Sequence, residues 1–407
     1  MVTMRGCTNY FNPLKQNHHM VQPKISIEEH RRWLRSSHLL EKINLNADSI
    51  IGKLSETLFG PSVDFFVGSS GWPNINAGPL ISIGETTETK SLFGLGYESI
   101  ISSRLAMARG KKFTSVYSPR ISENIREIAM STKPVDVEAH FSKKPSLELH
   151  FSPIVQPMGP SAPLRMLIEA ENPRIPRKVY SLYEEKIKAV EAISELLSHG
   201  FDNYYITKIF SAGVLGEEKR LVPTRWSITA SDDIIGKILI RKVKYYKENN
   251  EILVFSSYYL FNQFVVLLLP GRWEFENFEA WAPKTSWGLN PEQYTIIEEY
   301  EGWKGRWRYA EQAGGYYASR LAVLEYLERM KLQGRVVVFR EVYEGFYLPV
   351  GVWQVRENVR NALKQKPKKF TTIGEALDEV KKYLRLPLKE YTRRSRVLGQ
   401  AGLKDFL

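Results

Sequence analysis

Val336-Val-Val-Phe-Arg-Glu341 is the stretch that predicts the centre of the fold. Its β-branched run favours extended backbone, and an uninterrupted apolar run is typical of a strand covered on both faces. Arg340 and Glu341 place charges where this strand ends, and a loop over residues 345–353 leads into an expected helix over residues 354–364. Because mixed sheets often bind ligands where strands end and helices begin, charged residues here are candidates for a functional site.

Strand-like and helix-like patterns alternate through the rest of the chain, which predicts a mixed α/β (α+β) body centred on a sheet. The stretch 153–176 carries six prolines and is typical of a connecting segment, so we expect one or two lobes. The predicted parts are a polar N-terminal arm (1–24), an N-terminal α/β lobe (25–151), a C-terminal α/β lobe (177–385), a flexible basic linker (386–399) and a terminal peptide (400–407).

The charge of the chain favours a polyanionic partner. The 407 residues include 57 Lys and Arg against 45 Asp and Glu, a formal net charge of +12. Nucleic acid is the first candidate for such a partner, and a generally basic proteome is the alternative explanation. Residues 361–407 hold twelve Lys and Arg against five Asp and Glu, a net charge of +7, so the surplus is concentrated beside the terminal peptide.

The cysteine content and the lengths of the apolar runs indicate which metal sites the chain can form and in which cellular compartment it lies. Cys7 is the only cysteine, and with His18 and His19 it lacks the paired spacing of a zinc finger, so we expect no structural zinc and no other metal site there. No secretory signal is apparent, and the most apolar run, residues 264–269, is far too short to span a bilayer. We therefore expect a cytoplasmic protein.

Paired carboxylates form the first candidate site. Asp232 and Asp233, with Glu341 and Glu357, could hold a divalent ion such as Mg²⁺ or Mn²⁺ or act as a general base. The structural alternative is that Asp232 caps a helix that begins there and offsets its dipole. The arginines that could neutralise phosphate groups are Arg225, Arg272, Arg306, Arg308, Arg356 and Arg360.

Residues 296–309 form the second candidate site. Lys304, Arg306 and Arg308 alternate there with Trp303 and Trp307. This composition is typical of a nucleic-acid-binding surface, in which rings stack on bases and cations meet phosphates. An exposed hairpin whose tryptophans are buried is the competing interpretation.

The last eight residues, Gln-Ala-Gly-Leu-Lys-Asp-Phe-Leu, have the pattern of a docking peptide. One helical turn would place Leu403, Phe406 and Leu407 on one face, with the amide of Gln400 beside it. A single turn is not stable in water, so these side chains require a pocket, either on a partner or in the protein's own core. The pattern resembles the PCNA-interacting peptide, or PIP motif, by which replication and repair proteins dock onto the sliding clamp.

Longer motifs resemble the archaeal Nre family across nearly the whole chain. They are residues 66–80, residues 223–230 with Asp232 and Asp233, residues 313–317 with Arg320, and residues 348–353 with residues 355–360. The resemblance implies a protein of the DNA-damage response that binds the clamp through its C-terminal PIP motif. Some members carry an N-terminal cysteine cluster that this chain lacks, so no zinc role is implied, and neither is an active site.

Two functions are compatible with these patterns. The first is a DNA repair protein that binds DNA and is concentrated at the clamp, and hence at the nucleoid, by its C-terminal peptide; such tethering raises local concentration to roughly millimolar. The alternative is a clamp-tethered hydrolase, a nuclease or another phosphodiester- or nucleotide-processing enzyme. That enzyme would need Arg225, Asp232, Glu341 and Arg356 to line one cleft. A clamp-bound adaptor without DNA contact would need only the peptide.

Overall fold

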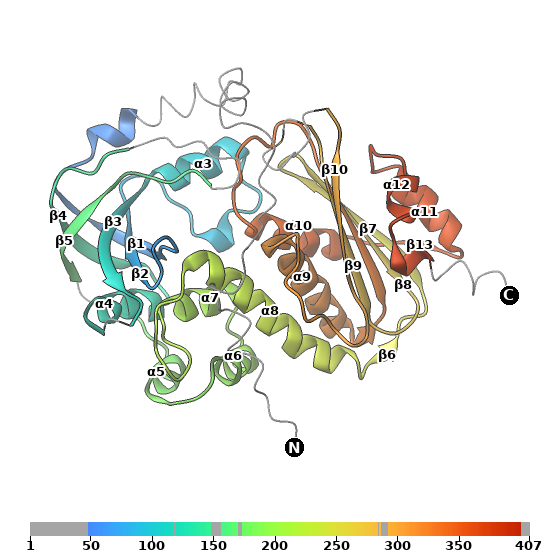
Figure 1. The fold of residues 1–407 in the computed structure, drawn as a ribbon, viewed down its shortest axis with the longest axis horizontal. Coiled ribbons are helices and arrows are strands. Elements are labelled where there is room, and N and C mark those ends of the chain that lie inside the picture. Colours follow the sequence, from blue (N-terminus) through green and yellow to red (C-terminus); the bar gives the residue numbers. More distant parts are fainter. Residues whose placement is uncertain are drawn as a thin grey trace.

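The fold consists of two sheet-centred lobes joined by a long helix (Figure 1). The computed structural model describes residues 48–117, 119–147, 156–169, 173–283, 285 and 292–399. The mixed α/β class is confirmed. In the part of the chain that is described, no helix is both long and apolar enough to cross a membrane.

The N-terminal lobe is a closed five-stranded barrel in the order β1-β2-β3-β5-β4. Buried and less buried side chains alternate along its strands. In β4, for example, Val135, Val137, Ala139 and Phe141 are buried while the residues between them are not. Its strands are β1 (Thr57–Val67), β2 (Asn74–Ser82), β3 (Met107–Ser115), β4 (Val135–Phe141) and β5 (Ser161–Glu169). Its helical elements are η1 (Thr89–Ser91), α3 (Tyr97–Leu105) and α4 (Pro119–Met130).

The N-terminal lobe ends later than predicted. Strand β5 lies between β3 and β4 and closes the barrel, so the expected boundary at residue 151 falls inside the lobe. The prolines of this stretch suggested a connection, but a strand that pairs over only a few residues on one side tolerates proline.

The C-terminal lobe contains a six-stranded sheet in the order β10-β9-β12-β8-β7-β13. The predicted central strand is confirmed as β12 (Arg335–Val342), which pairs parallel with β9 and antiparallel with β8. Val336 and Val338 pack on one face and Val337 and Phe339 on the other. The other strands are β7 (Ile252–Tyr259), β8 (Asn262–Leu269), β9 (Glu274–Trp281), β10 (Thr295–Glu301) and β13 (Lys368–Phe370); β6 (Lys247–Glu248) and β11 (Leu332–Gln333) form a separate pair.

Helices cover both faces of this sheet (Figure 1). One face carries α8 (Thr224–Val243), α9 (Gly314–Met330) and α10 (Trp353–Lys364), and the other carries α11 (Ile373–Lys381) and α12 (Lys389–Thr392). Three helices pack beside the barrel: α5 (Arg177–Glu184), α6 (Ala189–Ser198) and α7 (Asn203–Ser211). Helix α8 extends from beside the barrel to the region of β6 (Figure 1), and its Ile235 packs in the same apolar cluster as Phe65 and Val67 of β1.

Residues 386–399 are not the solvated linker that their arginines suggested. Tyr391 and Val397 are fully buried in the apolar cluster that contains Phe278 and Phe339. Polar contacts hold the same segment, because the Tyr391 hydroxyl donates to Glu341 over 2.7 Å. The apolar residues are spaced between the arginines, so the segment packs on the sheet while its charges remain outside. The terminal peptide, residues 400–407, lies outside the described residues.

The carboxylate of Glu276 holds the end of this packed segment. It accepts hydrogen bonds from the hydroxyl of Ser395 and, over 2.6 Å, from the backbone N–H of Arg396. Burial raises the pKa of Glu276 to about 7, although these two donors oppose the shift. The chain is therefore attached to the sheet to within a few residues of the terminal peptide.

Candidate nucleic-acid interface

Asp232 and Asp233 lie in the middle of α8, so the prediction that they begin a helix is wrong. The helix begins at Thr224, directly after Pro223, and its register turns Asp232 inward toward α10. Neither acid caps the helix. Both acids instead form ion pairs with arginines of other helices, Asp232 with Arg356 and Asp233 with Arg320.

Asp232 forms a buried ion pair with Arg356 of α10. The side chain of Asp232 is 0% exposed and that of Arg356 is 2% exposed. Burial raises the pKa of Asp232, and the guanidinium of Arg356 opposes the shift. Because the pair is sealed from solvent, it joins two helices and presents no group to a substrate.

Asp233 belongs to a second buried network. The guanidinium of Arg320 contacts Asp233 and Glu301, each over 2.6 Å, and the Tyr316 hydroxyl donates to Glu301 over 3.0 Å. Burial lowers the pKa of Arg320, but the two carboxylates outweigh it and raise the pKa above its ordinary value. This network joins α8, α9 and β10. Lys237 contacts the outer oxygen of Asp233 over 2.6 Å, at the edge of the network.

Glu341 and Glu357 are also engaged in structural contacts. Glu341 lies on the opposite face of the sheet, where it accepts bonds from the backbone N–H groups of Arg385 (2.7 Å) and Leu386 (3.0 Å). Glu357 accepts bonds from Tyr204 and Arg360. The carboxylates proposed for a hydrolase are therefore not brought together in one cleft. Among the described residues, no three His, Cys, Asp or Glu side chains are grouped to hold a metal ion.

The six candidate arginines divide into two groups. Arg356 and Arg360 are bound in ion pairs between helices, the latter to both oxygens of Glu325 over 2.6 and 2.7 Å. The other four lie along one side of the molecule, on the first turn of α8, before β9 and in the turn that follows β10: Arg225, Arg272, Arg306 and Arg308.

A basic and aromatic surface, which we call the α8 surface, extends along these elements. Lys237 and Arg241 of α8 and Lys244, which directly follows it, repeat at helical spacing and so share a face. Arg272 and the turn 302–309 lie beside this helix. The residues of the α8 surface are Lys237, Arg241, Lys244, Arg272, Trp303, Lys304, Trp307 and Arg308.

Cations lie over both tryptophans of the α8 surface. The Lys244 ammonium is 5.0 Å and the Arg272 guanidinium 5.8 Å from the ring centroid of Trp303, and Arg308 is 4.3 Å from that of Trp307. Trp303 is 42% exposed and Trp307 is 69% exposed. The interpretation that these tryptophans are buried is therefore wrong.

A small hollow lies between α8 and the turn 302–309. Its lining combines three cations with one carboxylate and two phenol rings: Lys237, Arg306, Arg308, Asp233, Tyr309, Tyr317, and also Thr229. Arg306 is fixed by Glu299 over 2.7 Å, and its Nη1 is buried without a hydrogen-bond partner among the described residues. Burial raises the pKa of Tyr309, and Thr229 and Arg225 oppose the shift. Positive charge therefore predominates in the hollow.

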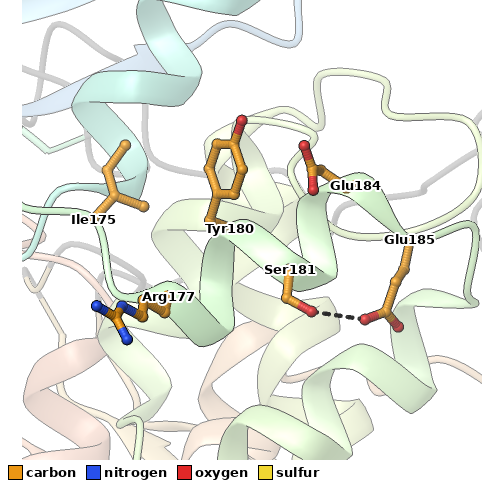
Figure 2. Close-up of a pocket in the computed structure, with 6 residues that line it drawn as sticks. All are labelled: Ile175, Arg177, Tyr180, Ser181, Glu184 and Glu185. Atoms are coloured by element: carbon orange, nitrogen blue, oxygen red, sulfur yellow. Dashed lines mark hydrogen bonds between the residues drawn. The ribbon is translucent and has the colours of Figure 1, made fainter.

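A larger hollow of about 530 Å³ lies elsewhere, beside α5 (Figure 2). Tyr180 and Glu184 line it, and the Ser181 hydroxyl donates to Glu185 over 2.9 Å. Its two glutamates outnumber its one arginine, Arg177, so its lining does not favour phosphate, and it contains none of the candidate residues. It does not share the chemistry of the α8 surface.

Sequence reasoning missed Lys237, Lys244, Tyr309 and Tyr317 as site residues. The spacing of the lysines and Arg241 was a detectable signal, because cations at i, i+4 and i+7 mark one face of a helix. The two tyrosines carried no such signal. They face the hollow only because the turn 302–309 folds back on α8.

The stretches that carried the family resemblance meet in space. The backbone N–H of Val67 donates to Thr224 over 2.9 Å, which joins the first stretch to the second. A Cβ added at Gly314 would lie 2.9 Å from Val352 and 3.3 Å from Thr229, so the starts of α9, α10 and α8 also converge. Fold and surface together define a two-lobed α/β protein with a basic aromatic face.

This chain belongs to the archaeal Nre family. Residues 34–288 match the family described as Archaeal Nre, N-terminal, and residues 301–406 match Archaeal Nre, C-terminal. It is 39% identical to DNA repair protein NreA of Archaeoglobus fulgidus over 87% of this chain and 91% of that protein. It is 37% identical to NreA of Haloferax volcanii (89% and 90%) and to NreB of A. fulgidus (82% and 86%), both also named DNA repair proteins. No solved structure matches it.

Proposed function

We propose that this protein is a DNA repair factor that binds DNA through the α8 surface and docks on the sliding clamp through its C-terminal peptide. Membership of the Nre family and the names of the relatives support the DNA repair role. The observation that carries the DNA-binding part is the row of cations on α8 and the adjoining turn. These side chains come from three separate segments and gather on one face.

The local charge balance of this surface favours phosphate contact. Lys237 is paired with Asp233, and Arg272 lies 3.6 Å from a carboxylate oxygen of Glu248. Arg241, Lys304 and Arg308 are exposed and form no ion pair with a described residue. Exposed cations on one face attract a polyanion over the Debye length of about 8 Å at physiological salt. Each phosphate that they neutralise releases a counterion, which makes affinity depend on salt.

Replacing Lys244, Arg272 and Arg308 together with glutamine is expected to weaken DNA binding and reduce its dependence on salt. Each lost phosphate contact lowers the slope of log affinity against log salt by about 0.7–0.9. Fluorescence anisotropy with a labelled oligonucleotide across a salt series measures both quantities. Arg165→Gln, which removes an exposed arginine on the barrel, is the matched control. Wild-type affinity that does not change with salt would contradict phosphate contact.

The docking part of the proposal is supported by the spacing of four residues in the C-terminal peptide: Gln400, Leu403, Phe406 and Leu407. The packed segment before it supports the same proposal in a different way. Because residues up to Leu398 are held on the sheet, the body would be kept close to the clamp rather than at the end of a long tether.

Deleting residues 400–407 is expected to abolish binding to the cognate clamp and to leave the melting temperature unchanged. Phe406→Ala with Leu407→Ala should have the same effect, because these side chains would fill the partner pocket. Lys404→Ala, at a position outside the motif, is the control. Surface plasmon resonance and thermal melting provide the two readouts. Retained clamp binding, or a lowered melting temperature, would show that the peptide packs on its own protein.

A further inference from the structure

The tryptophans of the α8 surface have a role that phosphate binding alone does not explain. Trp307 leaves 69% of its surface in solvent, and Trp303 leaves 42%. Large apolar groups that lie together on a surface usually mark a contact with a partner. Two indole rings in one short turn, each beside a cation, match the composition of surfaces on which nucleic-acid bases stack.

The backbone of the turn 302–309 is anchored before any ligand binds. The backbone N–H of Gly305 donates to Gly302, and Gly305 adopts a φ of +80° that favours glycine. Arg306 is fixed to Glu299, and the ammonium of Lys244 donates to the carbonyl of Trp303. A surface that is ordered before binding loses less entropy when it binds.

The hollow beside Trp307 has a volume of about 20 Å³, which is room for one water molecule, so a phosphate group would meet the cations at its rim. Arg308 lies over the Trp307 ring and also lines the hollow, so the ring and the phosphate-binding groups are adjacent. Lys237 and Arg306 line the same hollow but are paired with Asp233 and Glu299, so the exposed Arg308 is the lining cation that a backbone phosphate can reach.

We propose that the α8 surface binds single-stranded DNA, with backbone phosphates on its exposed cations and neighbouring bases stacked on Trp303 and Trp307. The inference rests on the proposed DNA binding and names the form of DNA. In a duplex the base faces are stacked on each other, and opening a base step costs energy before a side chain can reach it. In a single strand the faces are accessible, and stacking works for any sequence because every base has a π-face.

Three probes of about 15 nucleotides, a length in the range of known single-strand sites, separate the contribution of the bases to affinity from that of the phosphates. They are a single strand, its duplex, and an abasic single strand that keeps the phosphates and lacks the bases. The wild type is expected to bind the single strand most tightly. Trp303→Ala with Trp307→Ala should weaken single-strand binding about 10- to 100-fold and leave abasic-strand binding unchanged.

Two further variants test the assignment of roles. Trp303→Phe with Trp307→Phe keeps two aromatic faces and should retain most of the single-strand affinity. Arg308→Gln should weaken binding of all three probes and lower the salt slope, because it removes a phosphate contact. Tyr180→Ala on α5, which removes a 50% exposed ring outside the α8 surface, is the aromatic control and should change nothing.

Each outcome decides the proposal. Duplex affinity equal to or above single-strand affinity, or an equal loss on the abasic strand in the tryptophan variant, would overturn base stacking while leaving DNA binding itself intact. If the wild type bound none of the three probes, the proposed DNA binding and this inference would both fail. Unchanged melting temperatures of the variants would confirm that the losses arise at the surface.

Discussion

Replacing Arg356 with methionine is expected to lower the free energy of unfolding by about 3–5 kcal/mol, the usual cost of breaking a buried ion pair from one side. The variant would leave the carboxylate of Asp232 fully buried without its partner. Urea unfolding followed by circular dichroism measures the loss. The destabilisation should shrink at acid pH, because an unpaired buried carboxyl has a raised folded-state pKa, and stability then rises as pH falls through that value.

A double-mutant cycle with Asp232→Asn tests whether the two groups act as a pair. We expect the double variant to lose less than the sum of the single variants, because neither charge is then left alone. Arg241→Met, an exposed arginine on α8, is the matched control and should change stability by less than about 0.5 kcal/mol. An Asp232→Asn variant as stable as the wild type would contradict the structural role of this pair.

Replacing Glu341 with alanine is expected to cost about 3–5 kcal/mol and to release the segment 385–399 from the sheet. Glu341 accepts four hydrogen bonds, from the hydroxyls of Tyr343 and Tyr391 and from the backbone N–H groups of Arg385 and Leu386. Each buried donor left without an acceptor costs about 1–3 kcal/mol, and partial hydration of the released segment recovers some of it. Urea unfolding measures the loss, and limited proteolysis should show new cleavage within 385–399.

Glu344 provides the control for this variant. It contacts the same segment through Arg385 over 3.2 Å, but both side chains of that ion pair are more than half exposed. Surface ion pairs contribute little, so Glu344→Ala should leave stability and the proteolysis pattern nearly unchanged. The stability of Glu341→Gln should fall between the stabilities of Glu341→Ala and Glu344→Ala, because an amide keeps one of the two acceptor oxygens. Wild-type stability of Glu341→Ala would overturn the structural assignment.

Local patterns in the sequence predicted most of the elements. The β-branched run at 336–339 is the central strand, and the helix expected at 354–364 is α10. Thr372 and Glu375 form a capping box at the start of α11, another feature set by local spacing. These features depend on neighbours along the chain, so spacing and residue type were sufficient. The basic aromatic turn at 302–309 was also visible, because its composition is local.

The failed predictions share a physical cause. Asp232 and Asp233, which suggested a helix start, are instead paired with Arg356 and Arg320 from distant parts of the chain. The arginine-rich segment 386–399 packs because Glu276 and Glu341 in the sheet accept its donors. Composition alone makes both stretches look solvated, because the compensating partners lie far away in sequence.

By itself, the sequence determined the mixed α/β class, the central strand and the family of this protein, because each depends on the order and type of neighbouring residues. Only the tertiary structure decided which charges are structural and which face solvent. Asp232, Arg356 and Glu341 are internal contacts, whereas Arg272, Arg308 and two tryptophans form one exposed surface with α8. The reason is that burial and pairing are properties of contacts between distant segments, and residue type does not specify them.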